Sequence, residues 1–331
     1  MAQVTLDQIQ SVTTKALQVH GAADWIAESV AHAVRVAEAQ GNVICGLYYV
    51  ESYCKQLVSG RVNGTVEPVV TRAKPSVIEV DAGLGFAQPA FARGLNAAVM
   101  AARETGTVTF AIRHAHTCTS LGYFTRQIAQ SGLIGIGFTN ASAIVAPPGG
   151  KDRVLGTNPI AMHVPGPDGQ VAFGYDQSTS AIALGKITMA ASAGESIPLG
   201  WAVDDQGNPT TDPQAALKGA LVSTGGYKGW GFGLMVEVLA SALTDTASSR
   251  EVIGLKAPEG APHDLGQTYL MIDPMALAGQ AFHTRIDALR AAVEAQDGAR
   301  LPGSTPRHLD PVDVPDQLWI LIAGLAGTTQ T

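Results

Sequence analysis

The chain has 331 residues, of which 46% are hydrophobic and 15% charged, and its net charge is −7. This length allows two or three domains around a large core, and the lack of low-complexity tracts indicates an ordered globular protein. The negative charge argues against nucleic acid as a partner, and no apolar stretch has the length of a membrane span. The first residues lack a signal-peptide pattern, and three cysteines without CxxC spacing favour reduced thiols. We therefore expect a cytoplasmic protein.

The first third of the chain is predicted to be mainly helical. Apolar residues recur at helical spacing over 5–20, 24–39 and 47–58. A strand over 77–80 and an alanine-rich helix over 90–105 follow.

The remainder alternates short apolar runs with helical segments, which predicts an α/β or α+β fold. The predicted strands cover 108–112, 133–138, 161–164, 172–175 and 268–272. The predicted helices cover 122–130, 182–193, 213–218, 231–243, 276–294 and 316–326.

Three regions are expected along the chain. Residues 1–75 would form a helical part of the substrate and dimer domain, and 76–250 a central α/β region for cofactor binding and catalysis. Residues 251–331 would supply a strand and helices that pack back on the N-terminal region.

The stretch 113–123, RHAHTCTSLGY, concentrates titratable groups between a predicted strand and a predicted helix. In it, His116 lies beside two threonines, and Asp176 follows a later strand. A carboxylate near an imidazole would fix its tautomer and suit it to general acid–base chemistry. Equally, His116 can be satisfied by turn backbone while Asp176 caps a helix, and the residues alone leave both interpretations open.

Other chemistries have weaker sequence support. The Rossmann fingerprint GxGxxG after a strand and the Walker A sequence are both absent. Segments 148–150, 155–159 and 224–229 could still approach phosphates through backbone N–H groups, although each can be an ordinary loop. In the last of them, Lys228 precedes an apolar helix, whose N-terminus suits an anion. The histidine spacing contains no HExxH, so no metal is expected.

Several phrases together resemble the type 2 malate/L-lactate dehydrogenase family. They are GLIGIGFTNASAIVAPPGG, LGTNPIA, DQSTSAIALGKI, IPLGWAVDDQGNPTTDP and GGYKGWGFGLM, and the resemblance covers 5–325. It implies a homodimer that uses NAD(H) or NADP(H) to reduce, reversibly, a small 2-oxo acid or cyclic 2-imino acid. It also implies a non-Rossmann cofactor domain with a mainly antiparallel sheet flanked by helices.

The resemblance assigns roles to individual residues. His116 matches the proton donor and acceptor, and Asp176 either orients His116 or serves the cofactor. The positions that match cofactor contacts are Thr139, Asn140, Ala141, Gly156, Thr157, Asn158, Asp176, Gln177, Ser178 and Lys228.

The substrate pocket departs from the family pattern. Cys45 stands where the family has histidine and Tyr49 where it has arginine, and with Ala141 they would line the pocket. A substrate carboxylate would lose a bidentate partner that tyrosine cannot replace. The family's glycine after the catalytic histidine is also altered, in the 118–119 stretch. Two alternatives follow: a Δ1-pyrroline/Δ1-piperideine-2-carboxylate reductase specifically, or a dinucleotide-binding homologue without catalysis.

Overall fold

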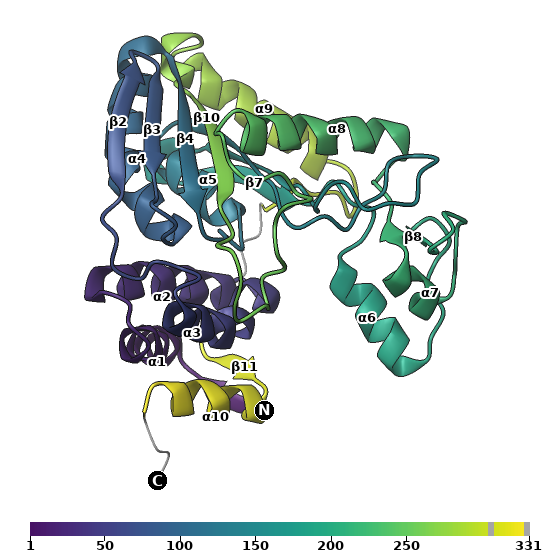
Figure 1. Cartoon of the computed structure of the whole chain (residues 1–331). Helices are drawn as coiled ribbons and strands as arrows, with labels where there is room; N and C mark the ends of the chain where they lie inside the picture. The colour runs from purple at the N-terminus through teal and green to yellow at the C-terminus, as the bar shows by residue number, and fades with distance from the viewer. Residues whose placement is uncertain (304–307, 328–331) are drawn as a thin grey trace.

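A seven-stranded mixed sheet lies at the centre of the computed structural model, which describes residues 1–303 and 308–327 (Figure 1). Every neighbouring pair of strands is antiparallel except β3 and β4. The mainly antiparallel sheet that the resemblance implies is therefore confirmed. In spatial order the strands are β2 (Val69–Lys74), β3 (Val77–Asp81), β4 (Thr107–Ala115), β10 (Leu265–Ile272), β5 (Ile134–Thr139), β6 (Ile160–Pro165) and β7 (Val171–Gln177).

Helices cover both faces of this sheet. On one face lie α4 (Ala87–Thr105) and α5 (Gly122–Gln130), and on the other lies α8 (Tyr227–Glu237) with its π-helical continuation η4 (Val238–Ala242). Side chains alternate along β10 accordingly, since Tyr269 and Met271 pack with α4 and α5, whereas Leu270 packs with Val236 of α8. The central region is thus a three-layer α/β/α arrangement.

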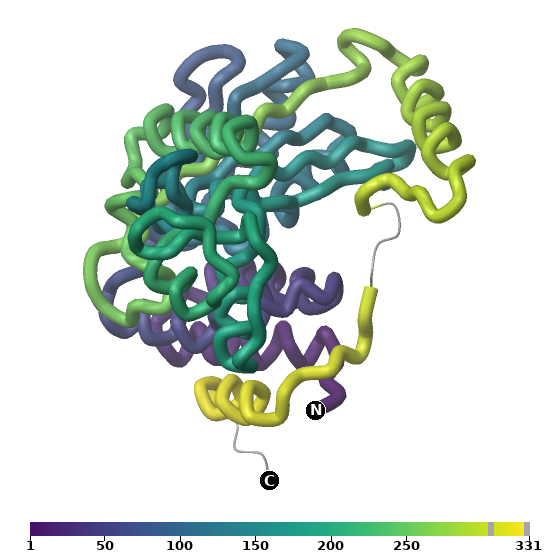
Figure 2. The backbone as a smooth tube through the Cα atoms, turned by 90° about the vertical axis from the view of Figure 1, so that its right-hand side faces the viewer, coloured from purple at the N-terminus to yellow at the C-terminus, as the bar shows by residue number. Residues whose placement is uncertain are grey.

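A second layer of helices contains both ends of the described chain. Figure 2 shows the C-terminal helix beside the N-terminal helices, below the sheet. These elements share one apolar core and are joined by pairing of β1 with β11. They are β1 (Ala2–Val4), α1 (Leu6–Val19), α2 (Asp24–Ala39), η1 (Val43–Cys45), η2 (Leu47–Tyr49), α3 (Val50–Ser59), β11 (Val312–Val314) and α10 (Asp316–Leu325).

A small lobe projects beside the sheet on the right of Figure 1. It has its own core, in which Ile187 and Leu221 are buried. Asp212 caps its second helix by accepting a hydrogen bond from the backbone of Gln214 (2.8 Å), as the sequence predicts. The lobe contains α6 (Leu184–Ala193), β8 (Ala202–Val203), α7 (Pro213–Lys218) and β9 (Ala220–Leu221).

Some elements differ from the sequence prediction. The edge strand β2 was not predicted, because all six of its residues are exposed and show no burial alternation. Helix α8 begins at Tyr227, four residues before the predicted start, directly after Gly226 with its φ of 62°. Helix α9 (Ala281–Glu294) begins five residues after the predicted start, because the short helix η5 (Pro274–Ala276) is a separate element and Gly279 has a φ of 54°. Another short helix, η3 (Pro167–Gly169), lies between β6 and β7.

The sheet also crosses the expected regional boundaries. Strand β2 comes from the expected N-terminal region, and β10, at the centre of the sheet, comes from the expected C-terminal region. Within that last region, β11 and α10 pack on the N-terminal helices. Residues 304–307 and 328–331 of it lie outside the described part of the chain.

Candidate active site

A cleft of about 600 Å³ opens between the segment after α2, the start of α5 and the ends of β6 and β7. Five of the predicted site residues line it: Cys45, Thr157, Asp176, Gln177 and Ser178. They come from three separate parts of the sequence, so the fold brings together one of the three expected pocket residues with part of the expected cofactor contacts. We call this feature the Asp176 cleft.

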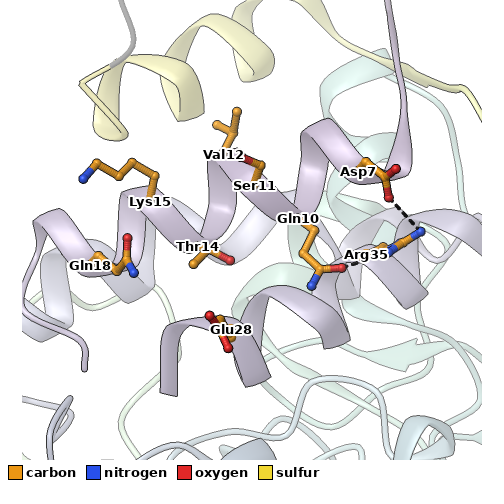
Figure 3. Close-up of a pocket in the computed structure, with 9 residues that line it drawn as sticks. All are labelled: Asp7, Gln10, Ser11, Val12, Thr14, Lys15, Gln18, Glu28 and Arg35. Carbon is orange, nitrogen blue, oxygen red and sulfur yellow. Dashed lines mark hydrogen bonds and ion pairs between the residues drawn. The ribbon is translucent and has the colours of Figure 1, made fainter. Parts of the chain in front are cut away.

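A second groove, of about 580 Å³, lies between α1 and α2 (Figure 3). Arg35 spans it and contacts Asp7 and Gln10, each at 3.0 Å. Its lining contains none of the predicted site residues, and two of its charged side chains, Asp7 and Arg35, pair with each other. We therefore place the candidate site in the Asp176 cleft.

Asp176 anchors the start of α5 to the end of β7. Its Oδ2 accepts hydrogen bonds from the backbone N–H of Gly122 (2.7 Å) and the hydroxyl of Ser120 (3.3 Å). Enclosure of the carboxylate by protein atoms raises its pKa, while these hydrogen bonds oppose the rise. One flank of the residue stays open to the cleft. Asp176 is thus a helix-anchoring carboxylate that is also accessible for proton exchange.

His116 lies in a closed aromatic box directly after β4. Its ring makes edge contacts with Tyr53 and Phe86, with centroids 5.9 and 5.4 Å away, and it stacks on His263 at 4.6 Å. We call these four residues the histidine box. The residue is 1% exposed, and neither ring nitrogen has a hydrogen-bond partner among the described residues. Burial, then the neighbouring His263 and Arg61, hold its pKa well below the usual range.

The structure therefore does not bring His116 and Asp176 together. The carboxylate binds the start of α5, and the imidazole is buried outside the set of residues that line the cleft. One cause lies in β4 itself, where His114 has a φ of 51° and its Nδ1 contacts Asp264 at 2.6 Å. This break in the extended backbone redirects the segment that follows it.

Arg61 closes the far side of the histidine box. The buried guanidinium donates to the carbonyls of Ile253 (2.9 Å), Gly254 (3.2 Å), Ala257 (2.6 Å) and Ala261 (2.9 Å). It thereby fixes the loop that carries His263 against the N-terminal helices.

The partner histidine of the box is also neutral at pH 7. Burial, followed by the charge of Arg61, lowers the pKa of His263 to about 4, with the carbonyl of Ile253 opposing. Sequence reasoning missed both Arg61 and His263, because neither belongs to a local motif.

Cys45 lines the cleft, whereas Tyr49 and Ala141, the other two expected pocket residues, are not among the residues that line it. Burial, together with the charge of Asp176, raises the pKa of the Cys45 thiol to about 12, so it stays protonated. Tyr49 stacks on Tyr53 with centroids 6.5 Å apart, and burial raises its pKa to about 12. Where the family pattern has two cationic side chains, this chain therefore presents a thiol and a phenol.

Thr119, in the altered 118–119 stretch, adopts a left-handed backbone conformation with a φ of 57° and lines the cleft. A β-branched residue rarely takes this conformation, which glycine takes freely. Thr119 therefore holds a conformation that glycine would adopt without strain.

The predicted cofactor residues outside the cleft form a buried cluster beside α8. Thr139 donates to the carbonyl of Gly266 (3.0 Å), and Asn140 donates to that of Ala247 (2.9 Å) while its Oδ1 is buried without a partner. Asn158 donates to the carboxylate of Glu237 (2.8 Å). A side chain at Gly156 would overlap the carbonyl of Ala141, so that position admits glycine only.

Lys228 is exposed in the first turn of α8, after two glycines with positive φ. A Cβ at Gly225 or Gly226 would meet nothing within 4 Å, so the approach to the helix N-terminus is open. This open terminus fits an anion such as a phosphate group.

Two further properties concern residues 1–303 and 308–327 only. No group of three or more His, Cys, Asp or Glu side chains there is arranged to hold a metal ion. No helix there is long and apolar enough to cross a bilayer.

Comparison with known proteins shows what this chain is similar to. A family model described as malate/L-lactate dehydrogenase matches residues 4–309. The chain is 40% identical to (2R)-3-sulfolactate dehydrogenase (NADP(+)) of Chromohalobacter salexigens, over 92% of this chain and 90% of that protein. It is 36% identical to Delta(1)-pyrroline-2-carboxylate reductase of Ancylobacter novellus, over 91% of this chain and 89% of that protein.

Solved structures agree with these relatives. Delta1-piperideine-2-carboxylate reductase from Pseudomonas syringae superimposes with a TM-score of 0.90 at 32% identity, covering 98% of this chain and 100% of that one. Sulfolactate dehydrogenase from Methanocaldococcus jannaschii gives a TM-score of 0.89 at 27% identity, covering 98% and 97%.

Proposed function

Because the chain belongs to the malate/L-lactate dehydrogenase family, we propose that it is an NAD(P)H-dependent oxidoreductase acting on a small 2-oxo acid or cyclic 2-imino acid. The reaction is reversible and yields a 2-hydroxy acid or a cyclic amino acid. The observation that carries the proposal is the Asp176 cleft, in which an ionisable carboxylate, a thiol and three more of the expected cofactor residues, Thr157, Gln177 and Ser178, share one cavity.

The dinucleotide would be held by the buried cluster beside α8 and by the cleft. Asn140 offers a free buried acceptor, Gly156 allows close approach to the backbone, and Lys228 offers a charge for phosphate. When bound, the reduced nicotinamide supplies the hydride. Gln177 and Ser178 line the cleft next to Asp176 and add polar contacts.

The proton is proposed to pass through Asp176. Its pKa is raised by burial and it lines the cleft, which suits it to general acid–base chemistry. His116, to which the resemblance assigns this role, would have to leave the histidine box to reach a substrate. Its assignment therefore stays a prediction, and variants at the two positions discriminate between them.

The non-catalytic alternative gains support from the same burial. Because His116 is buried and the Cys45 thiol is uncharged, the chain can bind a dinucleotide without turning over an acid. We rank it second, because Asp176 and the cofactor cluster are retained.

We further propose a homodimer that works in a reducing compartment such as the cytoplasm. The exposed apolar residues of α8 and η4 offer an interface, and the three free cysteines suit reducing conditions. Light scattering on the purified protein tests the dimer. The interface residues would be Phe232, Leu234, Met235 and Val238.

The deciding experiment measures NADPH and NADH oxidation by absorbance against a panel of acids. The panel contains pyruvate, oxaloacetate, 3-sulfopyruvate, 2-oxopantoate, Δ1-pyrroline-2-carboxylate and Δ1-piperideine-2-carboxylate. Turnover of one class supports the reductase and selects the oxo-acid or imino-acid branch. If no acid in the panel is reduced while coenzyme binding is still measurable by calorimetry, the non-catalytic alternative is favoured.

A further inference from the structure

Arg126 on α5 is a half-buried cation that lines the Asp176 cleft. Within residues 1–303 and 308–327 it has neither an ion-pair partner nor a hydrogen-bond acceptor. The other buried or half-buried arginines there are all engaged, by a carboxylate at Arg35 and Arg113 and by backbone carbonyls at Arg61 and Arg290. Since an enclosed charge without a partner is costly, Arg126 indicates an anion that comes from outside the protein.

The surroundings of Arg126 are shaped for such an anion. His163 lies beside it, with Nδ1 2.8 Å from the hydroxyl of Thr125, and burial followed by the charge of Arg126 lowers its pKa to about 4. The ring of His163 packs so closely on Gly174 that a side chain there would overlap it. Among the described residues that line the cleft, Arg126 is therefore the cationic group, and Tyr175 adds an aromatic surface.

Arg126 is displaced from the group proposed to exchange the proton. It lies one turn along α5 from Gly122, which binds Asp176, a rise of about 6 Å. On β7, Gly174 likewise precedes Asp176 by two residues, or about 7 Å of strand. An anion held by Arg126 would thus lie along the cleft from Asp176 and would not contact that carboxylate.

We propose that Arg126 binds the 2′-phosphate of NADP(H) and makes this chain selective for the phosphorylated coenzyme. A phosphomonoester has the charge and the planar pairs of oxygens that a guanidinium binds bidentately. Tyr175, which borders the same part of the cleft, provides a surface for the adenine ring. This inference rests on the proposed dinucleotide-dependent function and names the form of the coenzyme.

The test is direct binding by calorimetry, without any turnover. The ligands are NADPH, NADH, 2′,5′-ADP and 5′-AMP, and the proteins are wild type, Arg126→Gln and Arg126→Lys. Arg285→Gln, an exposed arginine on α9 outside the cleft, is the matched control. Loss of a charge-assisted pair should weaken NADPH and 2′,5′-ADP by about 10- to 100-fold in Arg126→Gln. NADH and 5′-AMP should change by less than about twofold, and Arg126→Lys should recover part of the loss.

Two results would overturn the inference. Equal weakening of NADPH and NADH would place Arg126 on the pyrophosphate. Unchanged nucleotide binding with a raised KM for the acid would place it on the substrate carboxylate.

The outcome is separable from that of the proposed function. Selective binding of 2′,5′-ADP that depends on Arg126 supports the inference even if no acid in the panel is reduced. Turnover with NADH and no affinity for 2′,5′-ADP would support the proposed reductase and contradict the 2′-phosphate site.

Discussion

The histidine box and the Asp176 cleft lie on two sides of the short connection between β4 and α5. They differ in how far the ionisable side chain is enclosed and whether it is hydrogen-bonded. In the box, His116 is enclosed by rings and held neutral without a hydrogen-bond partner among the described residues. In the cleft, Asp176 has two donors and an open flank. His116 and Ser120 are only four positions apart in the chain. One belongs to a closed, packed site, and the other to a site open to proton exchange.

The largest expected effect is on turnover and tests which of the two sites performs chemistry. Asp176→Asn keeps the acceptor for Gly122 but removes the exchangeable proton, so kcat should fall by about two to four orders of magnitude. His116→Asn should change kcat by less than about tenfold if the box is structural. Since the pKa of Asp176 is raised, kcat for reduction should fall as pH rises through that pKa.

Stopped assays with matched thermal melts check both variants. The reverse pattern, with a large loss of kcat in His116→Asn and little loss in Asp176→Asn, would indicate that His116 transfers the proton.

The second prediction concerns what closes the box. Arg61→Met leaves four carbonyls of the 253–261 loop without their donor, which should lower the unfolding free energy by about 3 to 5 kcal/mol. The control is Arg72→Met on the edge strand, whose ion pair with Glu104 is exposed and should contribute below about 1 kcal/mol. Urea unfolding measures both, and equal losses would contradict the structural role of Arg61.

The third prediction uses pH to separate the two regions. Unfolded histidines bind protons near their ordinary pKa, whereas folded His263 and His163 bind them only near pH 4. The unfolded state therefore holds more protons between about pH 6.5 and 4, and stability should fall as pH falls, by up to about 3 kcal/mol per group.

A phenylalanine variant isolates the contribution of the box. His263→Phe keeps the stacked ring and should flatten the slope by up to about 1.4 kcal/mol per pH unit. His308→Phe, at an exposed histidine, should leave the slope unchanged. Identical slopes in wild type and His263→Phe would refute the low pKa.

The smallest expected effect restores charge to the cleft wall. Cys45→His with Tyr49→Arg should raise kcat/KM for oxaloacetate or 3-sulfopyruvate by about tenfold, because a carboxylate or sulfonate gains charge-assisted contacts. Tyr49→Phe serves as the control, since it keeps the stacking on Tyr53 and adds no charge. Absence of any gain across the acids would mean that this wall does not face the substrate.

The sequence predicts much of this fold but not the direction in which its key histidine points. Helical periodicity locates α1, α2 and α5, and apolar runs locate β4 to β7. The resemblance predicts Asp176 as a site residue through a matching phrase and Cys45 through a departure from the family pattern, and both residues line one cleft. The environment of His116 is beyond such reasoning. It depends on the positive φ of His114 and on a partner, His263, almost 150 residues away.

The pairing of β1 with β11 has a consequence for how this protein is made. Ala2 is opposite Val314, and α1 packs against α10, so the helical layer is completed only after about 310 further residues have been synthesised. At typical elongation rates the partner of β1 emerges roughly 15 to 60 s later. During that time part of the apolar surface of α1 and α2 stays exposed. The nascent chain therefore depends on chaperones or on rapid synthesis.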